Sequence, residues 1–320
     1  MGEKYIITGA NGFVGRHLIK KIIEGDSGSE VFGIDLHGGE AKDIAPIGAF
    51  SFRELNLLDR VAVTQAIDSF SPTRLIHLAA ISSVAESWKK PAETFLNNTS
   101  IFLNLVEIFR DRRSDCRLLS VGSSEEYGNV LQNMLPIRED CLSQPTSPYG
   151  VARLSQEALS RVYASGYGLN IILTRSFNHI GPGQRETFVV PSIVRQFVLA
   201  EREGKKKFKL NVGNAMIIRD FTDVSDVVEA YLLLLGKGRP GEVYNVCSGK
   251  GVRILELIAA ISRITGIEAE IKEEGKLLRA TENVAIFGDN SKIFSECGWL
   301  PKIGLDESLA RIVDYWRNRP

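Results

Sequence analysis

The sequence lacks an excess of charge of either sign. Its 320 residues include 39 lysines and arginines and 39 aspartates and glutamates, so the formal net charge is zero. The one short like-charge run that stands out is Lys205-Lys206-Lys207. Proteins that bind nucleic acids or anionic membrane surfaces usually carry a basic patch or tail. We therefore expect neither kind of partner.

Cysteine and histidine are also scarce. Four cysteines occur, far apart and without a C-x-x-C pair, and four histidines occur without an H-x-x-x-H pair. Disulfide frameworks and zinc sites depend on such spacings. We therefore expect neither a disulfide scaffold nor a bound metal, and we interpret each cysteine as a small buried hydrophobic residue.

Long hydrophobic runs are missing as well. The longest strongly apolar run, Tyr231 to Leu235, is far shorter than the roughly 20 residues that span a bilayer. The first residues, Met1-Gly2-Glu3-Lys4, lead into a strand-like run without the charged-then-apolar pattern of a secretory signal. These absences predict a protein without a membrane span, in the cytoplasm.

What the sequence does contain is a regular alternation of strand-like and helix-like segments. Near-continuous apolar runs, typical of buried parallel strands, alternate with segments whose apolar residues recur at helical spacing. The expected strands are 5–8, 31–34, 51–57, 75–80, 116–121, 170–174, 208–212 and 243–246. The expected helices are 13–23, 59–70, 94–112, 148–166, 190–202 and 224–235. This order predicts an α/β fold, a doubly wound parallel sheet with a smaller, interleaved α/β domain.

A glycine-rich turn follows the first expected strand. Gly9, Gly12 and Gly15 are spaced G-x-x-G-x-x-G at the head of a helix, where glycines let the backbone approach a pyrophosphate closely. Asp35 ends the second strand, 20 residues beyond Gly15, near the spacing for a carboxylate on the adenosine ribose. The combination predicts dinucleotide binding on a Rossmann sheet. Because the Asp35 carboxylate would repel a 2′-phosphate, NAD(H) is favoured over NADP(H).

Two further segments carry hydroxyl and basic side chains. The fifth strand is followed by Gly122-Ser123-Ser124-Glu125-Glu126-Tyr127-Gly128, and a helix begins Pro148-Tyr149-Gly150-Val151-Ala152-Arg153. With the glycine turn, these segments resemble the extended short-chain dehydrogenase/reductase family, the NAD-dependent sugar-nucleotide epimerases, dehydratases and reductases. The resemblance implies an enzyme in which Tyr149 donates or accepts the proton. It also implies that Ser123 holds the substrate oxygen and that Arg153 stands where the family has lysine.

Arg153 is the main departure from the family pattern. Arginine keeps a positive charge, but it is longer and planar and cannot replace an ammonium group atom for atom. A working variant, a weakened site and an engineered change all remain open. On the resemblance alone, Arg153→Lys is expected to retain or raise activity.

The resemblance covers nearly the whole chain and implies the remaining site residues. The implied catalytic residues are Ser123, Tyr149, Arg153 and Glu125. The implied cofactor contacts are Gly9, Asn11, Gly12, Phe13, Val14, Gly15, Asp35, Asn56, Leu57, Leu78, Ala79, Ala80, Asn98, Tyr149 and Arg153. The implied substrate contacts are Ser83, Ser123, Ser124, Glu125, Asn178, Val189, Arg219, Arg279 and Glu282. The NAD-binding Rossmann domain would comprise residues 1–175 and about 218–248, and the sugar-nucleotide-binding domain residues 176–217 and 249–320.

The resemblance leaves the reaction open. Within the family, the blocks 122–128, 177–184, 219–224 and 243–249 look most like the GDP-4-keto-6-deoxy-D-mannose reductases, which form GDP-D-rhamnose. A 4,6-dehydratase would need a base near Glu125, and that glutamate is present. Residues 188–193, however, lack the Arg-Lys pair of similar dehydratases, so we favour the reductase. The alternatives are a GDP-mannose 4,6-dehydratase or another epimerase/dehydratase, and a catalytically weakened sugar-nucleotide binder.

Family members commonly dimerise through the helices that correspond to 94–112 and 148–166, so the resemblance implies a homodimer. Apolar positions of these helices, such as Phe102 and Leu154, suit packing on the sheet equally well.

Overall fold

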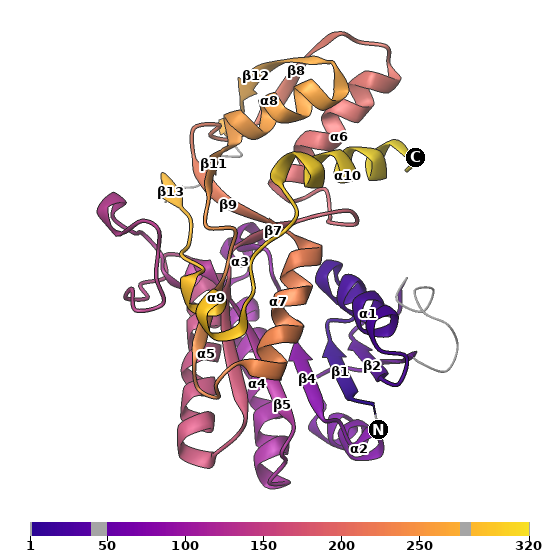
Figure 1. Ribbon diagram of the computed structural model, residues 1–320, viewed down its shortest axis with the longest axis vertical. Helices are drawn as coiled ribbons and strands as arrows, with labels where there is room; N and C mark the ends of the chain where they lie inside the picture. The colour runs from indigo at the N-terminus through magenta and orange to yellow at the C-terminus, as the bar shows by residue number, and fades with distance from the viewer. Residues whose placement is uncertain (1, 40–49, 276–282, 320) are drawn as a thin grey trace.

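The larger layer of the molecule is a seven-stranded sheet (Figure 1), seen in a computed structural model that describes residues 2–39, 50–275 and 283–319. All its neighbouring strands pair in parallel, in the order β10-β6-β5-β4-β1-β2-β3. The strands are β1 Lys4–Thr8, β2 Glu30–Asp35, β3 Phe50–Glu54, β4 Arg74–His77, β5 Arg117–Ser123, β6 Ile171–Ser176 and β10 Val243–Val246. This strand order confirms the predicted Rossmann-type α/β fold. The chain proceeds outward in one direction from β1 to β3 and in the other direction from β4, so the strand order reverses between β1 and β4. Sheets of this type bind ligands at that point, at the carboxyl ends of the strands.

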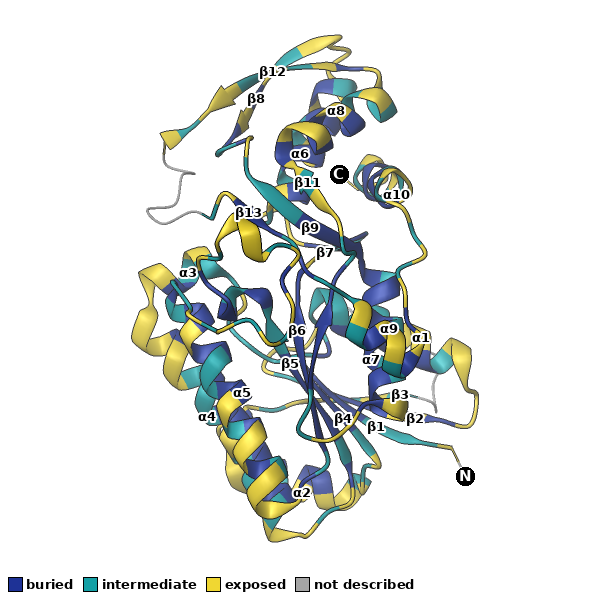
Figure 2. Ribbon diagram, turned by 60° about the vertical axis from the view of Figure 1, so that its left-hand side comes forward, coloured by how far each residue is buried: buried dark blue, intermediate teal, exposed yellow. Residues whose placement is uncertain are grey.

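Helices cover both faces of this sheet (Figure 2). One face carries α1 Phe13–Gly25, α7 Val224–Lys237 and α9 Ser291–Cys297. The other carries α2 Arg60–Phe70, α4 Pro91–Asp111 and α5 Pro148–Tyr167. Because side chains alternate along a strand, Ile7 of β1 joins the first core and Ile6 joins the second. Among the described residues, no helix has both the length and the apolar character needed to cross a membrane.

The strand β4 ends earlier than the sequence predicts. Residues 78–80, expected in the strand, form the loop after His77. Leu78 N still donates to Thr8 O at 3.2 Å, but Ala79 N donates to the Thr8 side-chain Oγ1 at 3.3 Å. The hydroxyl thus replaces a ladder partner and the chain leaves the sheet beside the glycine turn. Three short elements complete this region, α3 Val84–Lys89 and the 3₁₀ turns η2 Ser124–Glu126 and η3 Gln132–Met134.

A smaller layer lies beyond the carboxyl ends of the large sheet (Figure 1). Its core is shared by α6 Val189–Arg202, α8 Ile254–Thr265 and α10 Leu305–Arg317. The strands β8 Lys207–Val212 and β12 Glu268–Glu273 pair in parallel at its outer side. Between the two layers, β9 Ile218–Asp223 pairs with β7 Asn178–Ile180, β11 Gly251–Arg253 and β13 Ala285–Ile286. The division into a cofactor domain and a substrate domain stays a prediction.

Candidate active site

The glycine turn between β1 and α1 has no room for a Cβ at Gly9 or Gly15. Gly9 has a φ of +73°, and a Cβ on it would lie 2.8 Å from Ala79 N. A Cβ on Gly15 would meet Gly9 O and come within 2.7 Å of Ala10 O. Gly12 is the N-cap of α1, so the turn leads directly into the N-terminus of a helix, where anions are stabilised. The turn therefore fits the pyrophosphate of a dinucleotide.

Asp35 lies at the carboxyl end of β2, beside this turn. Its Oδ2 accepts a hydrogen bond from Asn11 N at 2.9 Å, and its Oδ1 accepts one from Leu36 N at 2.8 Å. The Asn11 side-chain amide donates to the carbonyl of His37. Each carboxylate oxygen has a further lone pair, so the oriented Asp35 can still accept hydrogen bonds from ribose hydroxyls.

A basic cavity of about 290 Å³ borders the turn at Asn11. Its lining includes Asn11 and Gly39 together with Arg16, Arg185 and Arg319. Guanidinium groups attract phosphate, so this cavity would favour a 2′-phosphate, against the predicted effect of Asp35.

The loops after β3 and β4 lie along the same edge of the sheet. Asn56 Oδ1 accepts from Leu58 N at 3.0 Å, and Leu57 is buried in the core. Asn98 of α4 accepts from Ile81 N at 2.8 Å and donates to Ile81 O at 3.1 Å. Asn98 therefore holds the loop that contains residues 78–80, and its own contact with a cofactor stays a prediction.

Ser123 and Tyr149 come from elements that pack against each other. Ser123 ends β5, and its Oγ accepts from Glu125 N at 3.3 Å. Tyr149 lies in the first turn of α5, next to Gly150, where a Cβ would come 2.6 Å from Glu125 O. Arg153, one turn further along α5, donates from Nε to the Tyr149 hydroxyl at 3.1 Å. The structure thus joins the predicted tyrosine–arginine pair and packs the turn after Ser123 against it.

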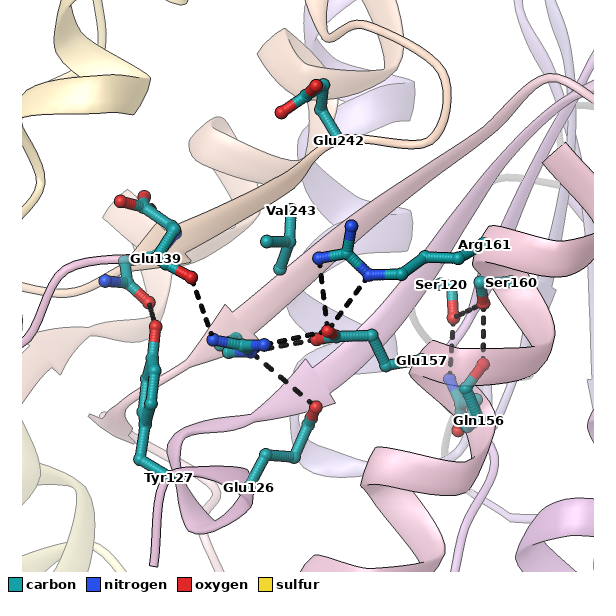
Figure 3. A network of polar contacts seen from close by, with 12 residues as sticks. Ser120, Glu126, Tyr127, Glu139, Gln156, Glu157, Ser160, Arg161, Glu242 and Val243 are labelled. Atoms are coloured by element: carbon teal, nitrogen blue, oxygen red, sulfur yellow. Dashed lines mark hydrogen bonds and ion pairs between the residues drawn. The ribbon is translucent and has the colours of Figure 1, made fainter. Parts of the chain in front are cut away.

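A buried charged network supports the Ser123 turn (Figure 3). Ser123 N donates to Glu126 Oε1 at 2.7 Å, and Arg175 lies 3.8 Å from Glu126 and 2.8 Å from Glu157. Burial, and then the charge of Glu157, raises the pKa of Glu126 well above its ordinary value. Burial acts on Glu157 in the same direction, but hydrogen bonds from Arg175 and its charge lower the pKa of Glu157. The proton of this pair therefore resides on Glu126.

Two of the implied substrate residues lie on the strands between the layers. Asn178 of β7 donates from Nδ2 to Asp220 O at 3.1 Å. Arg219 of β9 donates from Nη1 to the carbonyls of Ile218 and Asn283, both at 2.9 Å. These bonds fix both side chains beside the carboxyl ends of the large sheet.

Asp220, the neighbour of Arg219, joins three segments. Its fully buried carboxylate accepts from the Ser248 hydroxyl and from the backbone N–H groups of Ser248, Gly249 and Gly288. Burial raises the pKa of Asp220, although these hydrogen bonds act in the opposite direction. The bonds tie β9 to the turn after β10 and to the segment after β13.

The other implied substrate residues are more dispersed. Ser83 is the N-cap of α3 and accepts from Glu86 N at 3.2 Å, Ser124 is buried, and Val189 begins α6 with an exposed side chain. Arg279 and Glu282 lie outside the described residues. In the part of the chain that the structure describes, no group of His, Cys, Asp and Glu side chains could hold a metal ion.

The sequence analysis did not identify Glu126, Gln156 or Asp220 as parts of the site. Gln156 carried one usable signal, since it follows Arg153 by three residues and shares its helix face. Glu126 contacts Arg175, which lies on β6, and Asp220 binds segments that are distant in the sequence. Neither role can be recognised before the tertiary fold is known.

The family model described as GDP-mannose 4,6 dehydratase matches residues 6–312. The GDP-6-deoxy-D-mannose reductase of Pseudomonas aeruginosa is 33% identical over 319 residues, covering 100% of this chain and 99% of that protein. The structure of RMD from Pseudomonas aeruginosa complexed with NADPH has a TM-score of 0.86 at 31% identity, and covers 99% of this chain and 100% of the other. A Thermus thermophilus UDP-glucose 4-epimerase in complex with NAD has a TM-score of 0.87 at 28% identity, with coverages of 99% and 100%.

Proposed function

The chain belongs to the GDP-mannose 4,6 dehydratase family, and we propose that it acts within this family as a reductase. The proposed reaction converts the C4 keto group of GDP-4-keto-6-deoxy-D-mannose into the hydroxyl group of GDP-D-rhamnose. The observation that carries the proposal is the 3.1 Å hydrogen bond from Arg153 Nε to the Tyr149 hydroxyl. Through this bond the positive charge of Arg153 can stabilise the Tyr149 phenolate that forms when Tyr149 donates its proton. The similarity to a GDP-6-deoxy-D-mannose reductase supports the choice of substrate.

In this reaction the side chains of the site handle the proton. A bound nicotinamide supplies the hydride that reduces C4. Tyr149 transfers its phenolic proton to the carbonyl oxygen as that oxygen gains negative charge. Arg153 stabilises the resulting phenolate through its Nε–H. Ser123 Oγ accepts from Glu125 N, so the Ser123 hydroxyl proton can be donated to the same substrate oxygen.

The cofactor would be held by the glycine turn, Asp35 and the loop after β4. We propose NADH as the reductant, because the Asp35 carboxylate suits an adenosine ribose with two free hydroxyls. Arg153 Nη2 has no hydrogen-bond partner among the described residues, so this nitrogen would bind the nicotinamide ribose. Asn178 and Arg219, with Arg279, would hold the nucleotide diphosphate.

A 4,6-dehydratase is the second candidate. Glu125 supports it, because this carboxylate belongs to the turn that packs against α5 beside Tyr149. It could remove the C5 proton once C4 is oxidised.

Two incubations separate the candidates. A reductase consumes NADH with GDP-4-keto-6-deoxymannose and leaves GDP-mannose with NAD unchanged, as followed by absorbance at 340 nm and by product chromatography. Formation of a 4-keto-6-deoxy product from GDP-mannose would establish the dehydratase and overturn our proposal. Binding without turnover of either substrate would indicate a catalytically weakened protein.

We also propose a homodimer formed by α4 and α5. Leu96 and Leu103, seven residues apart on α4, and Val162 on α5 are exposed apolar side chains on these helices. Their exposure gives the two helices apolar surface outside the sheet contact, as a dimer interface requires.

A further inference from the structure

Arg153 is held by more than its contact with Tyr149. Its Nη1 donates to Val121 O at 3.1 Å and to Gln156 Oε1 at 2.8 Å. Only 4% of Arg153 and 1% of Gln156 is exposed. A planar guanidinium that is fixed at Nη1 has little freedom at Nε. The direction of the Nε–H bond to Tyr149 is therefore set by the partners of Nη1.

The orientation of the Gln156 amide is fixed in turn. Gln156 Nε2 donates to Ser120 Oγ at 2.9 Å and to Val121 O at 3.2 Å. The Ser120 hydroxyl also accepts a hydrogen bond from the Ser160 hydroxyl at 2.9 Å, and Figure 3 draws this contact beside Gln156. Because the NH₂ group of the amide faces these acceptors, its oxygen faces Arg153. Gln156 thus presents an acceptor to Arg153 and satisfies its own donors elsewhere.

We propose that Gln156 is a positioning residue that lets the Arg153 guanidinium act on Tyr149 in the place of a lysine. The inference deepens the proposed reaction, on which its kinetic part rests. A lysine at position 153 has one nitrogen and would leave Gln156 Oε1 as a buried acceptor without its donor, which is costly. The family resemblance alone predicts that Arg153→Lys retains or raises activity. The contacts of Arg153 in this chain predict the opposite, a loss of activity.

The titratable groups that the structure describes next to Arg153 do not form ion pairs that would draw its guanidinium away from Tyr149. Burial, and then the charge of Arg153, lowers the pKa of His77 on β4 to about 3. Burial raises the pKa of Tyr231 on α7. Both side chains are therefore uncharged at neutral pH. On η2, Glu126 holds the proton that it shares with Glu157. Glu125 is left unchanged in every variant below, so it contributes equally to each comparison.

The first test replaces Gln156 with methionine, which has a similar shape and cannot hold Arg153. We expect Gln156→Met to lower kcat about tenfold with little change in KM, because the phenolate is less well stabilised in the transition state. The high-pH limb of the turnover profile should move to higher pH, since the phenol keeps its proton longer. The control is Ser155→Ala, which removes a hydroxyl of α5 that donates to Val151 O and belongs to none of the contacts of Gln156 or Arg153 described above. An unchanged kcat and pH profile in Gln156→Met would overturn the inference.

The second test is rescue. Arg153→Lys should lose about tenfold in kcat, and Arg153→Lys combined with Gln156→Met should regain part of that loss, because no buried acceptor is then orphaned. If the two losses in kcat simply multiply, Gln156 and residue 153 act independently of each other and the inference is wrong. The rescue comparison remains decisive if Gln156→Met by itself folds poorly.

A spectroscopic titration separates this inference from the proposed function. The phenolate absorbance of Tyr149 is obtained by subtracting the pH-dependent absorbance of the Tyr149→Phe variant from that of the same protein with Tyr149. No substrate is needed for this measurement. A shift of this signal to higher pH in Gln156→Met supports the inference even if wild type reduces no 4-keto sugar nucleotide, in which case the proposed function alone fails. Reduction by wild type with an unshifted signal in Gln156→Met overturns the inference alone.

Discussion

At the scale of single residues, the most consequential side chain outside the catalytic group is Glu126. It accepts the Ser123 N–H, so it fixes the end of β5, where the proposed catalytic hydroxyl of Ser123 lies. It is fully buried, and burial together with the charge of Glu157 keeps its proton in place. A neutral carboxylic acid still has acceptor capacity, so Glu126 can hold the Ser123 N–H without carrying a charge into the core.

We expect Glu126→Gln to fold and to show a flatter dependence of stability on pH. The folded-state pKa of Glu126 is raised above its ordinary value of 4.5, so the folded state holds this proton more tightly than the unfolded state. Its contribution is therefore full below about pH 4.5 and is lost as the pH rises through the raised value. Glutamine cannot lose that proton, so this loss disappears. Urea unfolding between pH 5 and 9 measures the effect, with the exposed Glu24→Gln as control. Equal slopes in Glu126→Gln and wild type would contradict it.

Asp35 carries the prediction about the cofactor. We expect wild type to bind NADH more tightly than NADPH, and Asp35→Ala to narrow the difference about tenfold or more. The variant loses the repulsion of a 2′-phosphate but keeps the basic cavity lined by Arg16 and Arg185. Fluorescence titration with both reduced cofactors measures the two affinities. Tighter binding of NADPH by wild type would mean that the arginines outweigh Asp35.

At the scale of elements, α1 offers two glycines in one helix with opposite surroundings. A Cβ on Gly15 would collide with the backbone of the glycine turn, whereas a Cβ on Gly25 would meet no atom within 4 Å. The first glycine is therefore required by packing, and the second is not.

We expect Gly15→Ala to lower the free energy of unfolding by about 1–3 kcal/mol, as overpacking does, and to weaken cofactor binding because the turn must shift. Gly25→Ala should change stability by less than about 1 kcal/mol, in the stabilising direction. Chemical denaturation and cofactor titration of both variants test the pair. Similar effects at the two positions would show that the turn tolerates a side chain.

The elements that the sequence predicted well are those whose pattern is local. Apart from the edge strand β3, the strands of the large sheet are mostly buried and read as apolar runs. The helix α5 starts at an evident Ser147-Pro148 cap. The strand β12, Glu-Ala-Glu-Ile-Lys-Glu, was missed because its charged residues lie in a half-exposed pair with β8. The strand β9 was missed because Asp220, a buried charge, interrupts its apolar pattern and is satisfied only by segments distant in sequence.

The candidate site shows the same limit. The glycine turn, Asp35 and the Tyr149–Arg153 pair depend on spacing and were recognisable. The partners that hold them, Gln156 for Arg153 and Glu126 for Ser123, depend on which side chains face inward after packing, and spacing alone does not determine that.

At the scale of the whole molecule, the proposed dimer depends on α4 and α5. We expect the double change Leu96→Glu and Leu103→Glu to convert a dimer into monomers, because it places charges on the exposed apolar face of α4. Sedimentation velocity measures the state. Leu131→Glu, which changes a leucine away from these helices that is at least as exposed as Leu96 and Leu103, serves as the control and should leave the dimer intact. A double variant that remains dimeric would locate the interface elsewhere.

The interleaving of the two layers has a consequence for synthesis on the ribosome. The core beneath α1 also needs α7 and α9, and the edge strand β10 comes from residues 243–246. When only residues 1–176 have emerged, inward-facing side chains such as Leu119 and Ile172 lack the helices that later cover them. Folding of the large sheet must therefore wait for the last third of the chain. A truncated nascent chain exposes one apolar face, and the two layers cannot be produced as separate folded fragments.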